Sequence, residues 1–251
     1  MWFNYYATSI EKDQDFPINS AYSRERYGII MSKINSTRSG CKDVFHAFLV
    51  QNAKYDGYLE FPRLNLETAI PNKLIPFSKA IRSIDTDAWV HFYEDDVAFE
   101  RLWNQPHKYL PILKKFNGVI SPDFSVYRDM PLAMQYWNIY RSRALAHWFQ
   151  ENGICVIPNI RFGDHRTYLP VCYGIKKHGV IAVGAHGCIK LREERSFFQA
   201  GLRSVVTELK PSAIIIYGAA PDTLFDEYRK EGIQIIPFYS EFMLSRKAVG
   251  A

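Results

Sequence analysis

Acidic and histidine side chains follow several short apolar runs of the sequence, close to where each run ends. Asp95, Asp123 and Asp164 are candidate catalytic carboxylates, and His186 is a candidate catalytic imidazole. A carboxylate pair can act as general acid and base on a glycosidic bond, and the same pair with Mg²⁺ can act on phosphate esters. Because the distance between the carboxylates decides between these reactions, both stay open. Mg²⁺ is the one cofactor that the sequence brings into consideration.

The three acidic residues Glu94, Asp95 and Asp96 are consecutive, so in an extended chain at most two of them point the same way. One can reach the edge of a sheet while another caps the helix that follows. Asp123 comes just past a strand, directly after Pro122, and has the better claim to a site.

The same loops carry cationic and polar side chains that could bind a ligand. Arg128 and Arg161 are the expected anion-binding groups, because a guanidinium forms paired hydrogen bonds with phosphate and carboxylate. The other candidate ligand-binding residues are Asn159, Cys188, Tyr217 and Glu241. A simpler interpretation of the arginines is ion pairing within the protein, with Asp123, Asp129 or Asp164 as partners.

Two glycines, Gly184 and Gly187, flank His186 and would let the backbone approach a ligand closely. A helix is predicted to start soon after, near Arg192, so its N-terminus could receive a phosphate. Cys188 could act as a nucleophile with His186 as its base, but covalent cysteine mechanisms are rare outside known motifs. We therefore expect His186 to contact a ligand and keep the Cys188 mechanism as the less favoured alternative.

The elements that must position these residues are short runs rich in Val and Ile, separated by longer amphipathic stretches. Near-continuous apolar runs are typical of strands covered on both faces, as in a parallel sheet. Strands are predicted at residues 73–77, 88–92, 118–121, 154–158, 179–184, 213–217 and 234–238. Helices are predicted over residues 131–152, 192–210 and 221–231. The alternation indicates the α/β class, with sites at the carboxyl ends of the strands.

Two architectures fit this alternation. The length suits a TIM-barrel-like (βα) repeat, complete or distorted, in which residues 58–61 could supply an eighth strand. The alternative is an open doubly wound sheet, but its common phosphate-binding fingerprints, G-x-G-x-x-G after a strand and G-x-x-x-x-G-K-[ST], do not occur. We favour the barrel, formed by an α/β domain at residues 73–251. Residues 1–72 would form an irregular N-terminal extension.

Composition excludes several classes of protein. The chain has 251 residues, 47% of them hydrophobic, and a formal net charge of +5, which excludes disorder as a description of the whole chain. The four cysteines form no C-x-x-C pair and match neither a zinc site nor a disulfide scaffold. No apolar stretch approaches the roughly 20 residues of a membrane span, and the N-terminus does not read as a signal peptide. We expect a cytoplasmic protein with no membrane partner.

Five segments, at residues 91–103, 121–131, 158–164, 184–190 and 217–222, carry a family resemblance. In this order they resemble the family known as domain of unknown function 4417, which occurs in bacteria, phages and mobile elements. The resemblance covers about residues 73–242, with Phe162 standing where the family more usually has Trp. It implies a phage or mobile-element setting and, because the family has no established activity, it implies no reaction.

The polar strand ends predict an enzyme acting on a nucleotide, nucleoside or nucleic acid, by glycosidic or phosphoester hydrolysis or transfer. Binding modules seldom need acids, bases and cations on so many strand ends. The alternative is a non-catalytic nucleotide-binding or nucleic-acid-binding protein that serves replication, regulation or the countering of host defence. Its support is the mild positive charge and the 15% aromatic content, since aromatic rings stack on bases. A third hypothesis is a protein partner that binds through aromatic residues of the first 72. The oligomeric state stays open.

Overall fold

The computed structural model describes residues 43, 45–185, 189 and 191–239. The chain divides into two compact units, Met1–Asn52 and Ala53–Ala251. The described part of the first unit contains a short 3-10 helix, η1 (Ala47–Val50). The backbone N–H of Phe48 in this helix donates a hydrogen bond to Asp43 Oδ2 at 3.1 Å.

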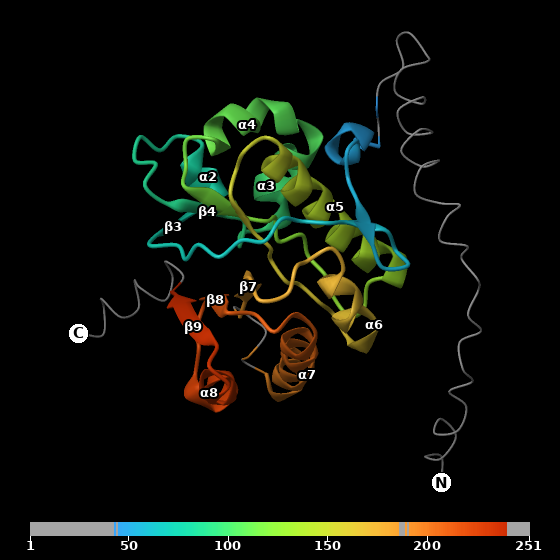
Figure 1. Ribbon diagram of the computed structural model, residues 1–251, viewed down its shortest axis with the longest axis vertical. Helices are drawn as coiled ribbons and strands as arrows, with labels where there is room; N and C mark the ends of the chain where they lie inside the picture. Colours follow the sequence, from blue (N-terminus) through green and yellow to red (C-terminus); the bar gives the residue numbers. More distant parts are fainter. Residues whose placement is uncertain (1–42, 44, 186–188, 190, 240–251) are drawn as a thin grey trace. The chain divides into compact units, whose positions relative to one another are not determined.

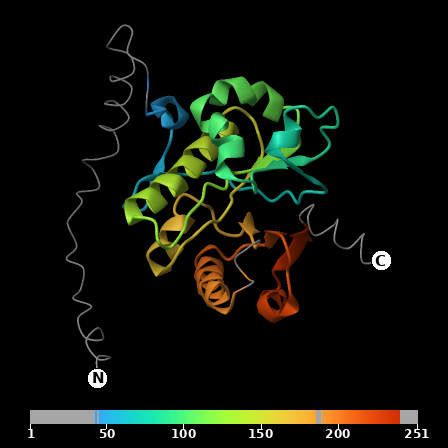
Figure 2. The ribbon, with the colours of Figure 1, turned by 180° about the vertical axis from the view of Figure 1, so that it is seen from behind.

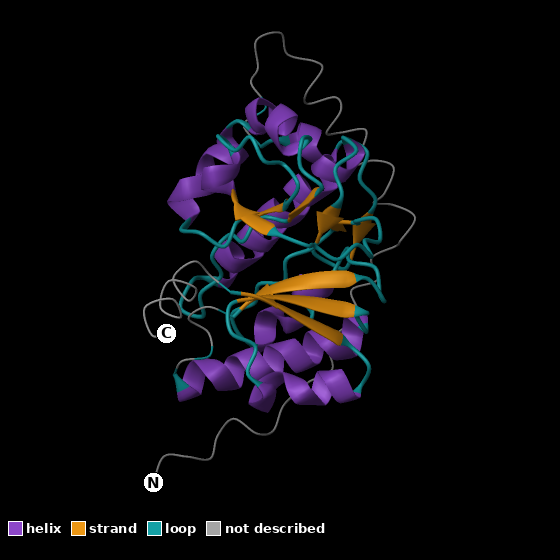
Figure 3. Ribbon diagram, turned by 90° about the vertical axis from the view of Figure 1, so that its left-hand side faces the viewer, coloured by secondary structure: helices purple, strands orange, loops and turns teal. Residues whose placement is uncertain are grey.

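The second unit contains a run of parallel strands. They are β3 (Leu74–Pro76), β4 (Trp89–His91), β5 (Gly118–Ile120), β6 (Val156–Ile157), β7 (Val180–Gly184), β8 (Ala213–Tyr217) and β9 (Gln234–Phe238). The first four form one sheet and the last three form another, each in chain order (Figure 3). A parallel bridge between Asn159 and Ala182 connects the chain just after β6 to β7. All the strands predicted between residues 73 and 238 are therefore confirmed, and so is the α/β class.

Helices lie between the parallel strands. They are α2 (Phe77–Ala80), α3 (Asp96–Asn104), α4 (Pro106–Leu113), α5 (Leu132–Glu151), α6 (His165–Tyr168), η2 (Pro170–Cys172), α7 (Arg192–Leu209) and α8 (Asp222–Lys230). Figures 1 and 2 show α2–α5 gathered around β3–β6, and α7 and α8 beside β7–β9. The three helices predicted from periodicity are confirmed as α5, α7 and α8.

Both faces of the second sheet are covered by apolar side chains, because successive residues of a strand point to opposite faces. Ile181 and Val183 of β7 pack in a core cluster with Phe198 of α7. Val180 and Ala182 belong to a separate cluster on the other face. That second cluster takes side chains from every parallel strand: Leu74, Trp89, Ile120, Ile157, Val180, Ala182, Ala213, Ile215, Ile236 and Phe238.

The predicted strand at residues 58–61 is wrong. Instead, two short strands, β1 (Tyr55–Asp56) and β2 (Phe61–Pro62), pair antiparallel with each other. Gly57 and Glu60 between them have positive φ angles of 67° and 52°, so the chain turns back on itself here. Such a turn makes a hairpin and cannot continue a series of parallel strands.

The boundary between the two parts of the chain also differs from the sequence analysis, which assigned residues 1–72 to the extension. Residues 53–72 lie in the second compact unit. Phe61 is 2% exposed and packs in the core cluster with Ile139 of α5 and Val171 of η2. This boundary could not be predicted, because two-residue strands leave no periodic pattern in the sequence.

No helix in the described part of the chain is both long and apolar enough to cross a membrane.

Candidate functional site

Several polar and aromatic side chains come together where the parallel strands end. We call this group the strand-end cluster, and it consists of His91, Tyr93, Asp123, Asn159, Arg161 and Tyr217. His91 and Tyr217 are the last residues of β4 and β8, and the others follow β4, β5 and β6 within a few residues. The carboxyl ends of strands in parallel α/β proteins are the usual place for a site, because loops from several strands converge there.

A chain of hydrogen bonds joins three members of the cluster. The Tyr93 hydroxyl donates to Asn159 Oδ1 at 2.9 Å. Asn159 Nδ2 then donates to Asp123 Oδ1 at 2.7 Å. The other carboxylate oxygen, Asp123 Oδ2, lies 3.7 Å from Arg161 Nη1. Both oxygens of Asp123 therefore face a donor, and the carboxyl group is held in one orientation.

The backbone around Asn159 is fixed as firmly as its side chain. Its N–H donates to Ser121 Oγ at 2.8 Å, and that hydroxyl lies 3.2 Å from Ser142 Oγ on α5. The parallel bridge between Asn159 and Ala182 connects the same backbone to β7. The amide that positions Asp123 is thus tied to β5, α5 and β7 together.

The aromatic rings of the cluster pack face to face. The rings of Tyr93 and Tyr217 are stacked, with centroids 4.7 Å apart and 11° between their planes. The His91 ring lies 4.6 Å from that of Tyr217. A Cβ on Gly184, the last residue of β7, would approach the Tyr93 ring to 3.1 Å, so glycine leaves room for the stack.

Burial sets the protonation states within the cluster. It raises the pKa of Asp123, and the charge of Asp96 raises it further, while Arg161 and the Asn159 hydrogen bond offset part of the rise. Burial lowers the pKa of His91 to about 3, so its imidazole is neutral near pH 7. His91 Nδ1 accepts the Tyr93 N–H at 3.2 Å, which places the ring proton on Nε2. A largely buried carboxyl with a raised pKa is suited to general acid–base catalysis.

The carboxylate whose charge acts on Asp123 is Asp96, the first residue of α3. Ser125 fixes Asp96 through its backbone N–H, 3.1 Å from Oδ2, and through its hydroxyl, 2.9 Å from Oδ1. The sequence analysis considered Asp96 with Glu94 and Asp95, as a helix cap or a site residue, and chose Asp95 of the three as the catalytic candidate. The carboxylate that acts on Asp123 is therefore Asp96, the residue after Asp95, in place of the expected Asp95 or Asp164.

The structure does not bring Asp95 or Asp164 to Asp123. Asp95 is exposed and stands at the N-cap position of α3 without a side-chain cap hydrogen bond. Asp164 caps α6, accepting the backbone N–H of Arg166 at 3.0 Å, and pairs with the Arg166 guanidinium at 2.7 Å. Among the described residues, no hydrogen bond or ion pair joins either carboxylate to Asp123. Their geometry is that of helix ends, where carboxylates offset the helix dipole.

Arg128 and Arg161 have separate surroundings. Arg128 pairs with Glu193 at 3.1 Å and also with Glu194, both in the first turn of α7, and its guanidinium lies over the Phe197 ring. The interpretation as an internal ion pair is right for Arg128, although its acidic partners are not those expected. Arg161 belongs to the strand-end cluster through its ion pair with Asp123, so the internal ion pair expected with Asp123 is present for this arginine.

Some predicted residues lie outside the described part of the chain. They are His186, Cys188 and Glu241. In residues 43, 45–185, 189 and 191–239, no group of three or more His, Cys, Asp or Glu side chains could hold a metal ion. The Mg²⁺ and His186 predictions therefore stay predictions.

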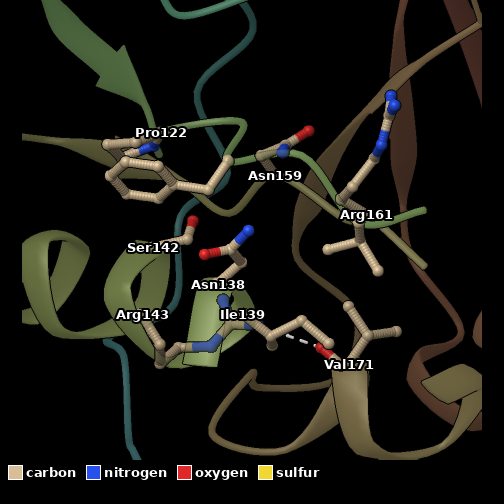
Figure 4. Close-up of a pocket in the computed structure, with 10 residues that line it drawn as sticks. Pro122, Asn138, Ile139, Ser142, Arg143, Asn159, Arg161 and Val171 are labelled. Carbon is tan, nitrogen blue, oxygen red and sulfur yellow. Dashed lines mark hydrogen bonds between the residues drawn. The ribbon is translucent and has the colours of Figure 1, made fainter. Parts of the chain in front are cut away.

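A cavity lies next to the strand-end cluster and shares Asn159 and Arg161 with it (Figure 4). Its remaining lining comes from the loop after β5, from α5 and from η2: Pro122, Phe124, Val126, Asn138, Ile139, Ser142, Arg143 and Val171. The sequence analysis missed the α5 residues. The signal was available, because Asn138 and Ser142 are four residues apart and so share a helix face. It also missed His91, the last residue of β4, and Tyr93, two residues further on, although this alternate spacing places them on one side if the chain stays extended.

These features define a parallel α/β protein with a polar cluster at the carboxyl ends of its strands. The family model described as "Domain of unknown function (DUF4417)" matches residues 53–239, and the chain belongs to this family. The resemblance found in the five segments is thus confirmed, and the match begins at residue 53 in place of 73.

The chain is also similar to two phage proteins. It is 30% identical over 197 residues to the "Gene 1 protein" of Mycobacterium phage D29, covering 76% of this chain and 72% of that protein. It is 33% identical over 130 residues to the "Gene 1 protein" of Mycobacterium phage L5, covering 51% of this chain and 56% of that protein. No solved structure matches. These relatives fit the phage setting that the resemblance implied.

Proposed function

We propose that the strand-end cluster is the active site of a hydrolase or transferase that acts on a nucleotide, nucleoside or nucleic acid. The observation that carries the proposal is Asp123, a carboxyl with 11% of its side chain exposed, a raised pKa, and a guanidinium 3.7 Å away. A structural ion pair would not need the chain of hydrogen bonds from Tyr93 through Asn159. Groups with pKa values perturbed in this way gather at functional sites.

The fold that we propose for this enzyme is an opened TIM-barrel-like (βα) repeat. The strands β3–β9 run parallel in chain order, which is the order of a barrel, and all contribute to one apolar cluster. Among the strands that the structure describes, β9 is not paired with β3. A doubly wound sheet reverses its strand order at a switch point, and the described strands have no such reversal.

Four residues of the cluster have a proposed role in the reaction. Asp123 moves the proton of the reacting group, and Arg161 balances its charge and contacts an anionic part of the substrate. The stacked rings of Tyr93 and Tyr217 are a platform beside which a base or sugar can lie. Glycosidic and phosphoester reactions both remain within the proposal, with Asp96 as the second carboxylate. The proposed setting is a phage or mobile element acting in the host cytoplasm.

The first experiment is a thermal-shift panel on the full chain, followed by product analysis. The panel holds nucleosides, nucleotides, NAD and short single-stranded and double-stranded oligonucleotides, each with and without Mg²⁺. Any compound that shifts the unfolding temperature is incubated with the protein, and products are separated by chromatography and identified by mass. We expect turnover of one compound class by the wild-type chain and turnover about 10²–10⁴-fold slower by Asp123→Asn.

The matched control is Asp226→Asn, which changes an exposed aspartate of α8 that pairs with Arg229. It should turn over substrate like the wild type. Turnover by folded Asp123→Asn within tenfold of the wild-type rate would contradict the proposal. Binding of a panel compound without any product would replace it with the non-catalytic binding function.

A further inference from the structure

Four large apolar side chains are exposed on α3, on α5 and on the loop that precedes α5. Val97 of α3 is 84% exposed, and Tyr127 of the loop is 52% exposed. Met134 and Trp137 of α5 are 51% and 45% exposed. We call these four residues the α3–α5 patch. Single exposed apolar residues are common on proteins, whereas several in one place mark a contact surface, so their relative positions decide what they mean.

The loop that carries Tyr127 is fastened to the start of α3. The Tyr127 hydroxyl lies 3.1 Å from Ser125 Oγ, and Ser125 Oγ donates to Asp96 Oδ1 at 2.9 Å. Val97 is the next residue of that helix. Asn138 of α5 donates to the backbone oxygen of Ser125 at 2.6 Å, so α5 meets the loop at the same place. Tyr127 and Val97 therefore stand on neighbouring segments.

The helices α3 and α5 also touch each other at Trp137 (Figure 1). The Trp137 ring lies against that of Trp103 of α3, with centroids 5.5 Å apart, and is stacked on that of Tyr140 at 5.7 Å. Met134 is three residues earlier in α5 and so on the same side of the helix. Two rings hold Trp137 in place while almost half of it is exposed. A side chain that is already fixed loses little conformational freedom on binding, which suits the anchor of an interface.

Exposed carboxylates stand at two edges of the patch. Asp95 directly precedes α3, and Asp129 follows Tyr127 by two residues. Neither has an ion pair within the part of the chain that the structure describes. Arg128 and Arg141, which lie beside the patch, are already paired with glutamates. The chain as a whole has a formal charge of +5, so this acidic edge is a local feature of the surface.

We propose that the α3–α5 patch is a docking surface for a protein segment whose apolar or aromatic anchors are flanked by lysine or arginine. Tyrosine, tryptophan and methionine are enriched in protein interfaces, and the patch contains all three. A basic segment would gain charge complementarity with Asp95 and Asp129, whereas the phosphates of a nucleic acid or a lipid would be repelled by them. No residue of the patch belongs to the strand-end cluster, so the proposal is independent of the proposed reaction.

The probe is a library of random peptides displayed on phage and selected on the full chain. Each selected peptide is synthesised with a fluorescent label and titrated with the protein, and binding is followed by fluorescence anisotropy. We expect sequences that combine Trp, Phe or Leu with Lys or Arg, and affinities that fall as salt is added. Trp137→Ala should weaken binding about 30-fold, as the loss of an interface anchor does. Circular dichroism shows whether this variant is folded.

A charge variant tests the patch without changing any packed side chain. Asp95→Asn combined with Asp129→Lys should weaken binding of the selected peptides by about tenfold, because it removes one carboxylate and reverses the other. The control Ile84→Ala removes a fully exposed apolar side chain between α2 and β4 and should bind like the wild type. Unchanged binding in the charge variant would overturn the proposal. A selection that yields no peptide with a preference for the wild type over Trp137→Ala would also overturn it.

Other occupants of the patch give distinct results. A labelled oligothymidine strand that binds the wild type and not Trp137→Ala would replace the protein segment with a single-stranded nucleic acid. Analytical ultracentrifugation of the wild type and of Trp137→Ala tests for a second copy of the chain. A wild-type dimer that Trp137→Ala dissociates would overturn the proposal in favour of self-association, and we expect no such difference.

Discussion

The strand-end cluster shares Asn159 and Arg161 with the cavity that Arg143 lines. The two regions differ in whether their charged groups have partners. In the cluster, the Asp123 carboxylate faces a guanidinium at 3.7 Å and an amide donor at 2.7 Å. In the cavity, Nε and Nη1 of Arg143 have no hydrogen-bond partner among the described residues, and no described carboxylate pairs with that guanidinium. In the first region the carboxyl group is held by its neighbours, and the proposed function has Asp123 move a proton there. In the second region two buried N–H groups are left without described partners.

The same contrast holds between two arginines of α5. Arg141 pairs with Glu100 at 2.7 Å, and its guanidinium carbon lies 3.9 Å from the centre of the Phe124 ring. Arg143 lies two positions further along the same helix, and in the part of the chain that the structure describes it has neither kind of partner for its charge. Burial alone therefore does not decide whether an arginine of α5 has a counterion.

The largest effect should come from the cluster. Asp123→Asn keeps the acceptor for Asn159 Nδ2 but removes the titrating proton. On a substrate found by the panel, it should lower kcat by about 10²–10⁴-fold, the usual contribution of a general acid or base. Steady-state kinetics with circular dichroism of both proteins measures this. A loss smaller than tenfold in a folded variant would show that Asp123 is not the proton-transfer group.

A smaller effect, on stability, should follow when Arg141 loses its carboxylate partner. Glu100→Ala removes the carboxylate that pairs with Arg141 and leaves a nearly buried cation alone. Breaking a buried pair costs about 3–5 kcal/mol, and because Glu100 is 38% exposed we expect about 1–3 kcal/mol of lost stability. Urea unfolding measures it. An unchanged free energy of unfolding would mean that water already screens Arg141.

The smallest effect should come from the outer end of the hydrogen-bond chain. Tyr93→Phe removes the hydroxyl that donates to Asn159 Oδ1 but keeps the ring stacked on Tyr217. The free energy of unfolding should fall by about 1 kcal/mol, the usual net value of one hydrogen bond. Chemical denaturation checks the loss, with Tyr239→Phe, at an exposed position just after β9, as the control. A larger loss in the control than in Tyr93→Phe would show that the hydroxyl does not support the cluster.

The parallel strands and the helices α5, α7 and α8 were predictable, because the local sequence pattern determines them. The runs that became β7 and β8 are buried on both faces, and α7 places Phe198, Leu202, Val205 and Leu209 on one apolar side. The position of Asp123 followed from the same pattern, since strand ends were expected to carry the site. These features need only the chain on either side of each residue.

The polar interior of α5 was not predictable in this way, because its partners come from distant segments. Arg141 meets Glu100, 41 residues earlier, and Arg143 meets Val171, 28 residues later. Asp96 was passed over in favour of Asp95 for a similar reason. Only the fold shows that Ser125 holds Asp96 while Asp95 is exposed. Side chains that act through tertiary contacts leave little periodic signal in the sequence.

Asp123 should titrate above the ordinary aspartate value of 3.8, and carbon NMR of the carboxyl groups measures its titration. The Asp123 signal is the one that disappears in Asp123→Asn. Because its pKa is raised on folding, protonated Asp123 favours the folded state. Relative to Asp123→Asn, the wild type should lose stability as pH rises from 3.8 through the folded pKa. A midpoint clearly above 3.8 is the predicted result, and a midpoint at or below 3.8 would contradict the assignment of Asp123 as an acid–base group.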